Sequence, residues 1–179
     1  MSDSRHPSTP EGTGHPRHDL VSATEFRDGM AHLAAAVNIV TTGTPDDPVG
    51  FTATSVCSVS DAPPTLLVCA NRERSLAQAF LDNGHLCVNT LGAQHRDLAL
   101  LFGGGTPMAE RFAQARWELS ADNVPYLPDA AATFHCRISQ SQIIGTHAVL
   151  YCEVRQVTRT PGTDALTYFR RAFHELPDR

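Results

Sequence analysis

A run of hydroxyl-bearing and small residues in the first third of the chain is a candidate ligand-binding segment. It begins as Gly50-Phe51-Thr52-Ala53-Thr54-Ser55 and continues through Ser58-Val59-Ser60, where a half-buried strand would ordinarily be apolar at alternate positions. Such a strand can offer hydroxyl donors and backbone amides to a polar ligand that also needs an apolar wall. A strand whose hydroxyls simply face water fits the same composition.

A second candidate is the segment Asn71-Arg72-Glu73-Arg74-Ser75, which could bind phosphate. It follows a predicted strand and opens a predicted helix, so its amides, the Ser75 hydroxyl and two guanidinium groups converge on the positive end of the helix dipole. Arginine can bind phosphate through two hydrogen bonds at once. The alternative interpretation is a solvated loop with a serine N-cap.

The composition excludes several other chemistries. All 14 basic residues are arginine, so no lysine can form a Schiff base, anchor pyridoxal or serve a P-loop. The motifs G-x-S-x-G, H-E-x-x-H and G-x-G-x-x-G are also absent, which argues against hydrolase and kinase functions. A net charge of −5 without a basic cluster argues against nucleic-acid binding, and no apolar run approaches the length of a membrane span.

The cysteines and the N-terminal segment indicate a reduced, cytoplasmic protein. The five cysteines lack CxxC spacing, and we interpret them as buried free thiols rather than disulfides or metal ligands: Cys57, Cys69, Cys87, Cys136 and Cys152. Residues 1–20 are polar, rich in Pro, Gly and His, and have no apolar stretch typical of a signal peptide. We therefore expect a disordered tail, a cytoplasmic location and no metal site.

The candidate segments must be positioned by a scaffold, which begins with a predicted helix. Ser22 to Glu25 has the pattern of a capping box. Apolar residues then recur at helical spacing and predict a stripe that packs into the core: Phe26, Met30, Leu33, Ala34 and Val37. Short helices are also predicted at 75–81 and 94–102, the second ending at a loop of three glycines.

The remaining patterned segments predict strands. A hairpin is expected on either side of the turn at 44–48, and further strands at 65–70 and 85–91. Apolar residues alternate strictly before and after Gly145, which predicts one long hairpin with two inward rows: Ala132, Phe134, Cys136 and Ile138, then Ala148, Leu150, Cys152 and Val154. About six or seven strands joined by hairpins predict a mainly β fold, an antiparallel barrel that is closed or partly open. We expect one domain over residues 21–176.

An ordered set of motifs resembles a known family. The set comprises Gly50 to Ser60, Pro63-Pro64, Asn71 to Ser75, Val88-Asn89, Arg111-Phe112, Gly145-x-His147 and Leu166-x-Tyr168-x-Arg170-x-x-Phe173. In this order the motifs are similar to those of the flavin reductase-like domain family, small NAD(P)H:flavin reductases that serve two-component monooxygenases. The resemblance extends from about Thr24 to Phe173.

The resemblance implies a fold and an activity. The fold would be an FMN-binding split β-barrel of Greek-key type, usually a homodimer with flavin near the subunit interface. The activity would be hydride transfer from NADH or NADPH to FMN or FAD, with the reduced flavin passed to a separate monooxygenase. Hydride transfer is intrinsic to the two cofactors, so such an enzyme needs no dedicated acid, base or metal.

The resemblance also implies roles for individual residues. Thr52, Ala53, Thr54 and Ser55 would line the isoalloxazine and the ribityl chain, and Asn71, Arg72 and Ser75 would hold the phosphate. Asn89, Thr90 and Leu91 would form a further wall, His147 would lie beside the nicotinamide, and Tyr168 and Arg170 would close over the pocket. Cys69, Ala70 and Phe102 complete the implied cofactor-binding set.

Two points stay open at the level of sequence. The family commonly has Gly-Asp-His where this chain has Gly145-Thr146-His147, so the carboxylate that would orient the imidazole is missing. The alternative functions are a reductase with tightly held flavin that passes electrons to another acceptor, and a non-catalytic flavin- or haem-binding module on the same barrel.

Overall fold

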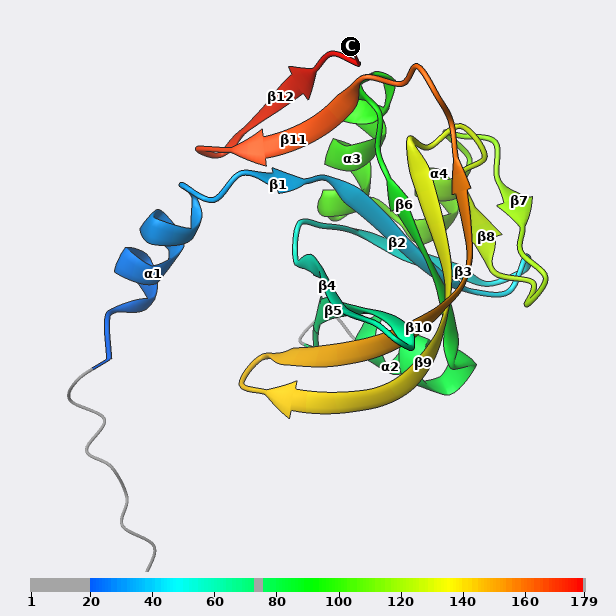
Figure 1. The fold of residues 1–179 in the computed structure, drawn as a ribbon, viewed down its shortest axis with the longest axis horizontal. Coiled ribbons are helices and arrows are strands. Elements are labelled where there is room, and N and C mark those ends of the chain that lie inside the picture. The colour runs from blue at the N-terminus through cyan, green and yellow to red at the C-terminus, as the bar shows by residue number, and fades with distance from the viewer. Residues whose placement is uncertain (1–19, 73–75, 179) are drawn as a thin grey trace, which may run out of the picture.

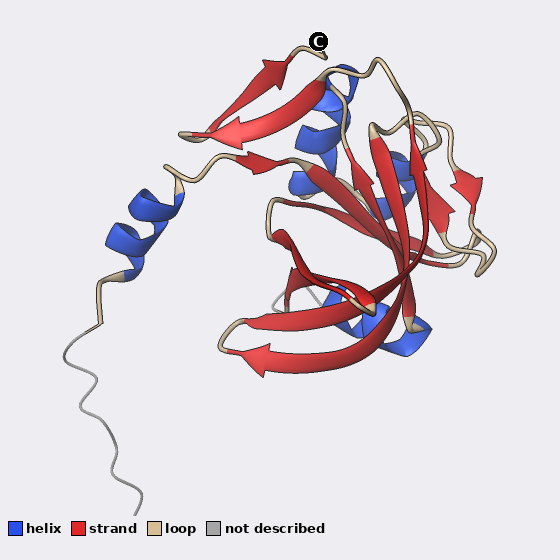
Figure 2. Ribbon diagram, viewed as in Figure 1, coloured by secondary structure: helices blue, strands red, loops and turns tan. Residues whose placement is uncertain are grey.

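The computed structural model describes residues 20–72 and 76–178, which form many strands and a few short helices (Figures 1 and 2). The helices are α1 (Ala23–Met30), α2 (Leu76–Asn83), the 3-10 helix η2 (Ala93–His95), α3 (Arg96–Gly103) and α4 (Met108–Phe112). The strands are β1 (Ala35–Ala36), β2 (Asn38–Gly43), β3 (Pro48–Ala53), β4 (Val56–Asp61), β5 (Pro64–Asn71), β6 (His85–Thr90), β7 (Glu118–Leu119), β8 (Pro125–Tyr126), β9 (Ala132–Ile144), β10 (His147–Arg159), β11 (Ala165–Phe169) and β12 (Ala172–Leu176). Of the tail predicted at residues 1–20, all but Leu20 lies outside the described residues.

Seven strands make one antiparallel sheet in the order β3-β2-β6-β9-β10-β5-β4. The sheet curls strongly but does not close, because β3 and β4 at its two edges have no pairing with each other (Figure 1). The predicted long hairpin is confirmed as β9 and β10, which reverse at Gly145 with a φ of +54°. The prediction of a mainly β, antiparallel split barrel is therefore confirmed.

One core cluster fills the barrel. The alternating residues of β10 that were predicted to point inward, Ala148, Leu150 and Cys152, are fully buried. They belong to a cluster that includes Val68 on β5 and Phe80 on α2. The period-two pattern thus identified the inner face of this strand correctly.

A second core cluster lies against α3 and the C-terminal strands. Ile39 on β2, Phe102 on α3 and Leu166 on β11 are buried within it. The rings of Phe112 and Trp117 pack against Phe102 with centroid distances of 5.1 and 5.6 Å. This cluster holds α3 beside β3, on which the candidate hydroxyl-rich segment begins.

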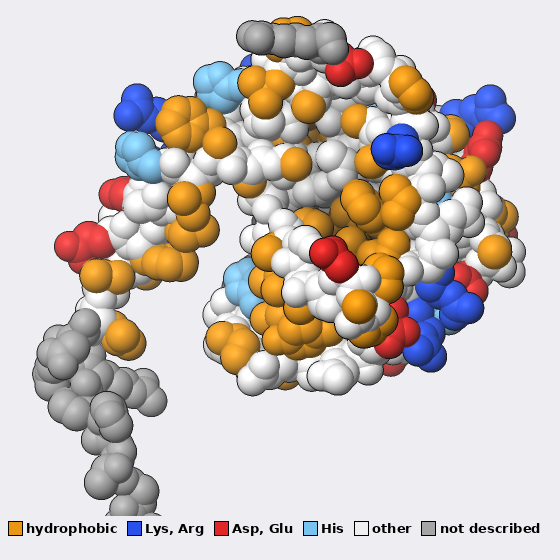
Figure 3. Space-filling model, in the orientation of Figure 1, with side chains coloured by type: hydrophobic (Ala, Val, Ile, Leu, Met, Phe, Trp, Pro, Cys, Tyr) orange, Lys and Arg blue, Asp and Glu red, His pale blue; other side chains and the backbone are white. Residues whose placement is uncertain are grey.

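Helix α1 departs from the sequence prediction. The capping box forms, because the Ser22 side chain accepts from the Glu25 amide and the Glu25 carboxylate accepts from the Ser22 amide. Most of its predicted apolar stripe, however, is not in the core: Phe26, Met30 and Leu33 are 59%, 47% and 60% exposed. Val37 is fully buried as predicted, but it lies beyond the helix, which ends at Met30. Figures 1 and 3 show α1 standing away from the barrel with hydrophobic side chains along it. Helical spacing predicts an apolar face but does not say what covers it.

The cysteines are free thiols, as predicted, but not all of them are buried. Cys87, Cys136 and Cys152 are buried, Cys69 is half-buried and Cys57 is exposed. Cys57 lies on β4, an edge strand of the sheet, and its side chain is exposed. Within the described residues, no helix is long and apolar enough to cross a membrane.

Candidate functional site

A groove runs along the edge of the barrel between β3 and α3. It consists of a narrow cavity of about 240 Å³ and a wide cavity of about 620 Å³, and both are lined by Thr52 and Gly103. The narrow cavity extends to Ala70 and Asn71, and the wide cavity extends to Tyr168 on β11. The two cavities therefore meet at one junction and together connect the end of β5 with the C-terminal hairpin.

The junction is built by small residues and one hydrogen bond. The Thr52 hydroxyl donates to the carbonyl of Ala99 at 2.7 Å, which ties β3 to α3. Gly50 allows Phe102 to lie against β3, because a Cβ there would be 2.9 Å from the phenyl ring. A Cβ on Gly103 would be 3.8 Å from the Cβ of Thr52, so a larger side chain at this position would enter the groove.

Arg111 holds the loop that follows α3. Its guanidinium donates to the carbonyls of Thr106 at 2.7 Å, Phe102 at 3.1 Å and Gly104 at 2.8 Å, and it is 6% exposed. These carbonyls lie at and beyond the C-terminus of α3, where a cation is favoured. The Arg111-Phe112 motif was part of the family resemblance, but no role was predicted for it. In the structure Arg111 holds the loop of three glycines beside the junction.

The narrow end of the groove lies where β5 ends and β10 begins. Asn71, the last residue of β5, pairs with His147, the first residue of β10. The Arg72 amide donates to the carbonyl of Thr146 at 3.0 Å, and the Arg72 side chain is exposed. Ser75, the third residue of the predicted phosphate set, lies outside the described residues.

The wide end of the groove is covered by the hairpin of β11 and β12. Tyr168 packs edge-on against Phe173 with a centroid distance of 5.3 Å, and both residues line the wide cavity. Thr54 lines it from the β3 side. Arg96 and Arg171 also line it, and neither was among the predicted site residues. The pair of arginines at 170 and 171, which lies between two short β segments, is the sequence feature from which Arg171 could have been predicted.

The structure brings together part of the predicted cofactor-binding set. Six of those residues line the groove: Thr52, Thr54, Ala70, Asn71, Phe102 and Tyr168. Arg72 follows Asn71 in the chain but lines neither cavity. The lining leaves out the buried Ala53, the exposed Ser55 and the half-buried Cys69. The guanidinium of Arg170 lies over the ring of Phe169 at 5.4 Å instead of in the groove.

Asn89 and Leu91 are fully buried in the core, and Thr90 is paired inside the chain. The Asn89 side chain donates to the carbonyl of Ile39 at 2.9 Å and accepts from the amide of Leu127 at 2.8 Å. Thr90 donates to the Asn38 side chain at 2.8 Å. Asn89 and Thr90 on β6 hold neighbouring strands and the segment after β8, and neither these two residues nor Leu91 line the groove.

His147 is exposed, as expected for a side chain on the face opposite Ala148. Its Nδ1 lies 3.0 Å from the hydroxyl of Thr146. The hydroxyl therefore occupies the position next to the imidazole where the resembling family carries a carboxylate. Neither groove cavity includes His147 in its lining, so its place beside a nicotinamide stays a prediction.

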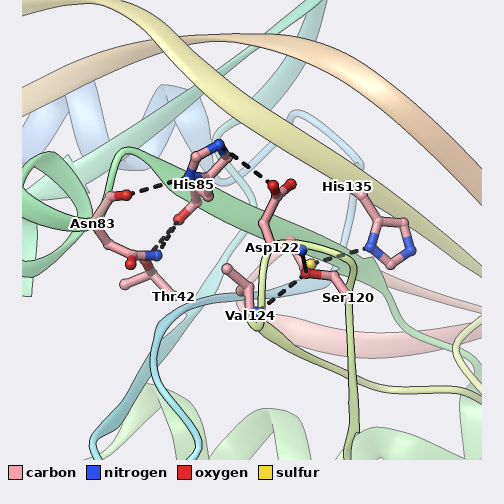
Figure 4. A network of polar contacts seen from close by, with 8 residues as sticks. Thr42, Asn83, His85, Ser120, Asp122, Val124 and His135 are labelled. Carbon is pink, nitrogen blue, oxygen red and sulfur yellow. Dashed lines mark hydrogen bonds and ion pairs between the residues drawn. The ribbon is translucent and has the colours of Figure 1, made fainter.

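A second polar region surrounds His85, Asp122 and His135, whose contacts are with other residues of the chain (Figure 4). His85 Nδ1 donates to the carbonyl of Asn83, and His85 Nε2 lies 3.7 Å from the Asp122 carboxylate. His135 Nδ1 lies 3.4 Å from the Cys87 sulfur. Burial lowers the pKa of His135 and raises the pKa of the Cys87 thiol to about 12. Among the described residues no cluster of His, Cys, Asp or Glu could hold a metal ion.

Comparisons with known proteins identify relatives of the chain. The sequence model of the family described as "Flavin reductase like domain" matches residues 30–177. A protein from Stutzerimonas stutzeri (strain A1501) named FMN reductase (NADH) RutF is 57% identical over 152 residues, which cover 85% of this chain and 87% of that protein.

Two solved structures have the same fold. BorF, the flavin reductase component of a bacterial two-component tryptophan halogenase, is 29% identical, with a TM-score of 0.80 over 88% of this chain and 100% of that chain. The NADH:FAD oxidoreductase SgcE6 of Streptomyces globisporus, solved with NAD and FAD fragments, is 26% identical, with a TM-score of 0.80 over 87% of this chain and 95% of that chain.

Proposed function

The chain belongs to the flavin reductase like domain family, and we propose that it is an NADH-dependent FMN reductase whose flavin occupies the groove between β3 and α3. The observation that carries this proposal is the junction at Thr52 and Gly103, which connects a narrow cavity beside Asn71 with a wide cavity under Tyr168. A flavin has this shape, with a slender phosphoribityl chain and a broad ring. FAD is the alternative flavin, as the name of SgcE6 states for that protein.

The residues present fit a flavin by their chemistry. Asn71 and the exposed guanidinium of Arg72 can bind a phosphate at the narrow end. The wide end has an aromatic wall at Tyr168 and hydroxyls at Thr52 and Thr54, which suits a ring with polar edges and apolar faces. No Asp or Glu of the described residues lines either cavity, which suits an anionic ligand.

The chain acts by binding and orientation. A flavin bound in the groove would accept a hydride from a reduced nicotinamide, a reaction intrinsic to the two cofactors. Thr52, whose hydroxyl donates to the Ala99 carbonyl, and Gly103 would form the floor under the ring, and Tyr168 would cover it, which would orient the ring for hydride transfer. His147 would assist by contact with the carboxamide of the nicotinamide.

The test is a steady-state assay of NADH oxidation at 340 nm with and without FMN or FAD. Oxidation that requires added flavin supports the proposal, and the absence of a flavin-dependent rate with either nicotinamide would refute it. Gly103→Leu should block the groove and weaken flavin binding at least tenfold, because its side chain extends toward Thr52. Gly105→Leu is the matched control, since a Cβ on Gly105 meets nothing within 4 Å and the residue lines neither cavity.

The proposed enzyme is a homodimer. The apolar stripe of α1, with Phe26, Met30 and Leu33 exposed, and the exposed Ile143 and Ile144 at the tip of the β9–β10 hairpin need a partner surface. A second copy related by a two-fold axis supplies one. Light scattering should give twice the 19.4 kDa chain mass, and a mass near 19.4 kDa at all concentrations would contradict the dimer.

The proposed recipient of the reduced flavin is a separate monooxygenase component in the cytoplasm. BorF is named as the reductase component of a two-component system, and this chain shares its fold with 100% of that protein covered. Five free thiols fit a reducing compartment. Purification with the neighbouring gene products, followed by a coupled oxygenation assay, tests this part of the proposal.

A further inference from the structure

Two arginines line the wide end of the groove from opposite elements. Arg96 is the first residue of α3, and Arg171 lies in the turn between β11 and β12. Both side chains are exposed. Among the described residues that line this cavity none is acidic, although the whole chain carries a net charge of −5. The cavity therefore favours an anionic ligand, although the molecule as a whole is negatively charged.

A cavity of about 700 Å³ on the other face of α3 has the reverse character. Its lining includes Asp97, Glu110 and Asp129 but only one arginine, Arg116. Arg96 and Asp97 are neighbours in sequence, yet a helix sends successive side chains about 100° apart, so they line different cavities. The preference for an anion is thus a local property of the groove.

Both guanidinium groups are held before a ligand arrives. Arg96 lies over the ring of Phe173, 5.9 Å from its centroid. Arg171 donates to the carboxylate of Asp28 on α1. A guanidinium has five N–H groups, so one carboxylate leaves donors of Arg171 for a ligand. Side chains that are already ordered lose less entropy when a ligand binds.

The backbone at Arg171 adds an independent argument. Phe169 pairs with Ala172, so Arg170 and Arg171 form a two-residue hairpin loop, and their φ angles are +49° and +61°. Such a loop favours Asn-Gly, because residues with a branched or long side chain disfavour positive φ. Arginine at this position is thus kept at a conformational cost, as is common for residues at binding sites.

We propose that Arg96 and Arg171 bind the pyrophosphate of the nicotinamide dinucleotide. This inference rests on the proposed function, which places the flavin phosphate at the Asn71–Arg72 end of the groove. A second phosphate of FAD would lie beyond that same end, on the far side of the ribityl chain from the ring. An anion at the opposite end therefore belongs to the other cofactor, whose nicotinamide must lie on the flavin ring near Thr52.

The experiment compares two hydride donors in the Arg171→Gly and Arg96→Ala variants with FMN present. NADH carries the pyrophosphate, whereas 1-benzyl-1,4-dihydronicotinamide carries no phosphate. Each variant should raise the KM for NADH about tenfold, as expected for a lost charge-assisted contact, and keep kcat. Both kinetic parameters for the benzyl donor should stay unchanged. Glycine suits positive φ, so the melting temperature of Arg171→Gly should equal or exceed that of the unmodified chain.

Matched controls separate charge and turn geometry from binding. Arg155→Ala removes an exposed arginine from β10 and should leave both donors unaffected. Arg170→Gly makes the same backbone change in the same turn outside the cavity lining, and its effect on the KM for NADH should be smaller than that of Arg171→Gly. Calorimetry with ADP-ribose and flavin-free protein should show about tenfold weaker binding in Arg171→Gly than in the unmodified chain.

Two results would overturn the proposal. Equal losses with NADH and with the benzyl donor would mean that the arginines act on the flavin or on the fold. Unchanged ADP-ribose affinity in both variants would mean that the pyrophosphate binds elsewhere. Failure of the proposed function is a different result, since the unmodified chain would then show no flavin-dependent oxidation with either donor.

Discussion

Two polar regions of the barrel differ in where their hydrogen bonds go. In the region across β6, the Asn89 side chain is fully buried and bonds to Ile39 and Leu127, both within the chain. In the groove, by contrast, Thr54 and Arg96 are exposed and line a cavity. A buried polar group with its partners inside the chain holds the fold, whereas polar groups around a cavity can serve a ligand. Polar side chains thus have different roles in the two regions.

The largest expected effect comes from breaking the buried region. Asn89→Ala removes hydrogen bonds to Ile39 and Leu127 and leaves buried backbone groups without partners, which should cost about 2 to 4 kcal/mol of unfolding free energy. Urea denaturation measures this loss. Flavin affinity per folded molecule should change less than twofold.

The half-buried Asn83 is the control for Asn89. Asn83→Ala loses bonds to the Thr42 hydroxyl and the His85 carbonyl, and because solvent reaches this site the cost should be only about 1 kcal/mol. If Asn89→Ala were stable but bound flavin weakly, Asn89 would be a wall of the flavin site, as the family resemblance implies, and the comparison of the two regions would fail.

The next effect concerns the narrow end of the groove. Arg72→Ala should raise the Kd for FMN about tenfold, because a charge-assisted bond to the phosphate is lost, with kcat at saturating FMN nearly unchanged. The side chain is exposed, so the melting temperature should stay the same. Riboflavin, which has no phosphate, is the internal control. Equal weakening of riboflavin and FMN would show that Arg72 does not contact the phosphate.

A smaller effect is expected at His147. His147→Ala should raise the KM for NADH about threefold and leave kcat and flavin affinity unchanged, the signature of lost uniform binding. Thr146→Val, which removes the hydroxyl 3.0 Å from Nδ1, should act in the same direction but less. A collapse of kcat at saturating NADH would instead place His147 in the transfer step.

Strand and helix predictions succeeded where a local period was strong. The alternation at Ala148, Leu150 and Cys152 identified the inner face of β10, and the Ser22 capping box identified the start of α1. The same helical period misled at Phe26 and Met30, which are exposed. Periodicity shows which side chains share a face, but the covering partner is set by tertiary or quaternary packing.

Site prediction had a similar limit. The hydroxyls of Thr52 and Thr54 were selected by composition, and both line the groove. Asn89 was selected through the family resemblance and is also polar, but it lies in the core, because its strand β6 runs inside the sheet and not at its edge. Arg171 was missed since its role depends on a turn that joins it to a cavity wall far away in sequence. Strand order decided each of these outcomes, and a single sequence does not reveal it.

The smallest expected effect is a pH dependence in the buried region. His135 is 6% exposed, and its burial lowers its pKa, an effect that the nearby Asp122 partly offsets. Below about pH 6.5 the unfolded chain binds a proton that the folded chain resists, so the free energy of unfolding should decrease as the pH falls from about 6.5 toward the folded pKa.

The ring of Tyr126 packs edge-on against His135 at 4.9 Å, which makes His135→Phe a variant that keeps a ring but cannot titrate. Urea denaturation between pH 5 and 8 should show a shallower loss toward acid in this variant, whereas the exposed His32→Phe should keep the slope of the unmodified chain. Identical slopes in all three proteins would mean that His135 is as free to take up a proton in the folded chain as in the unfolded one, and the buried region would then be more open to water than its hydrogen bonds indicate.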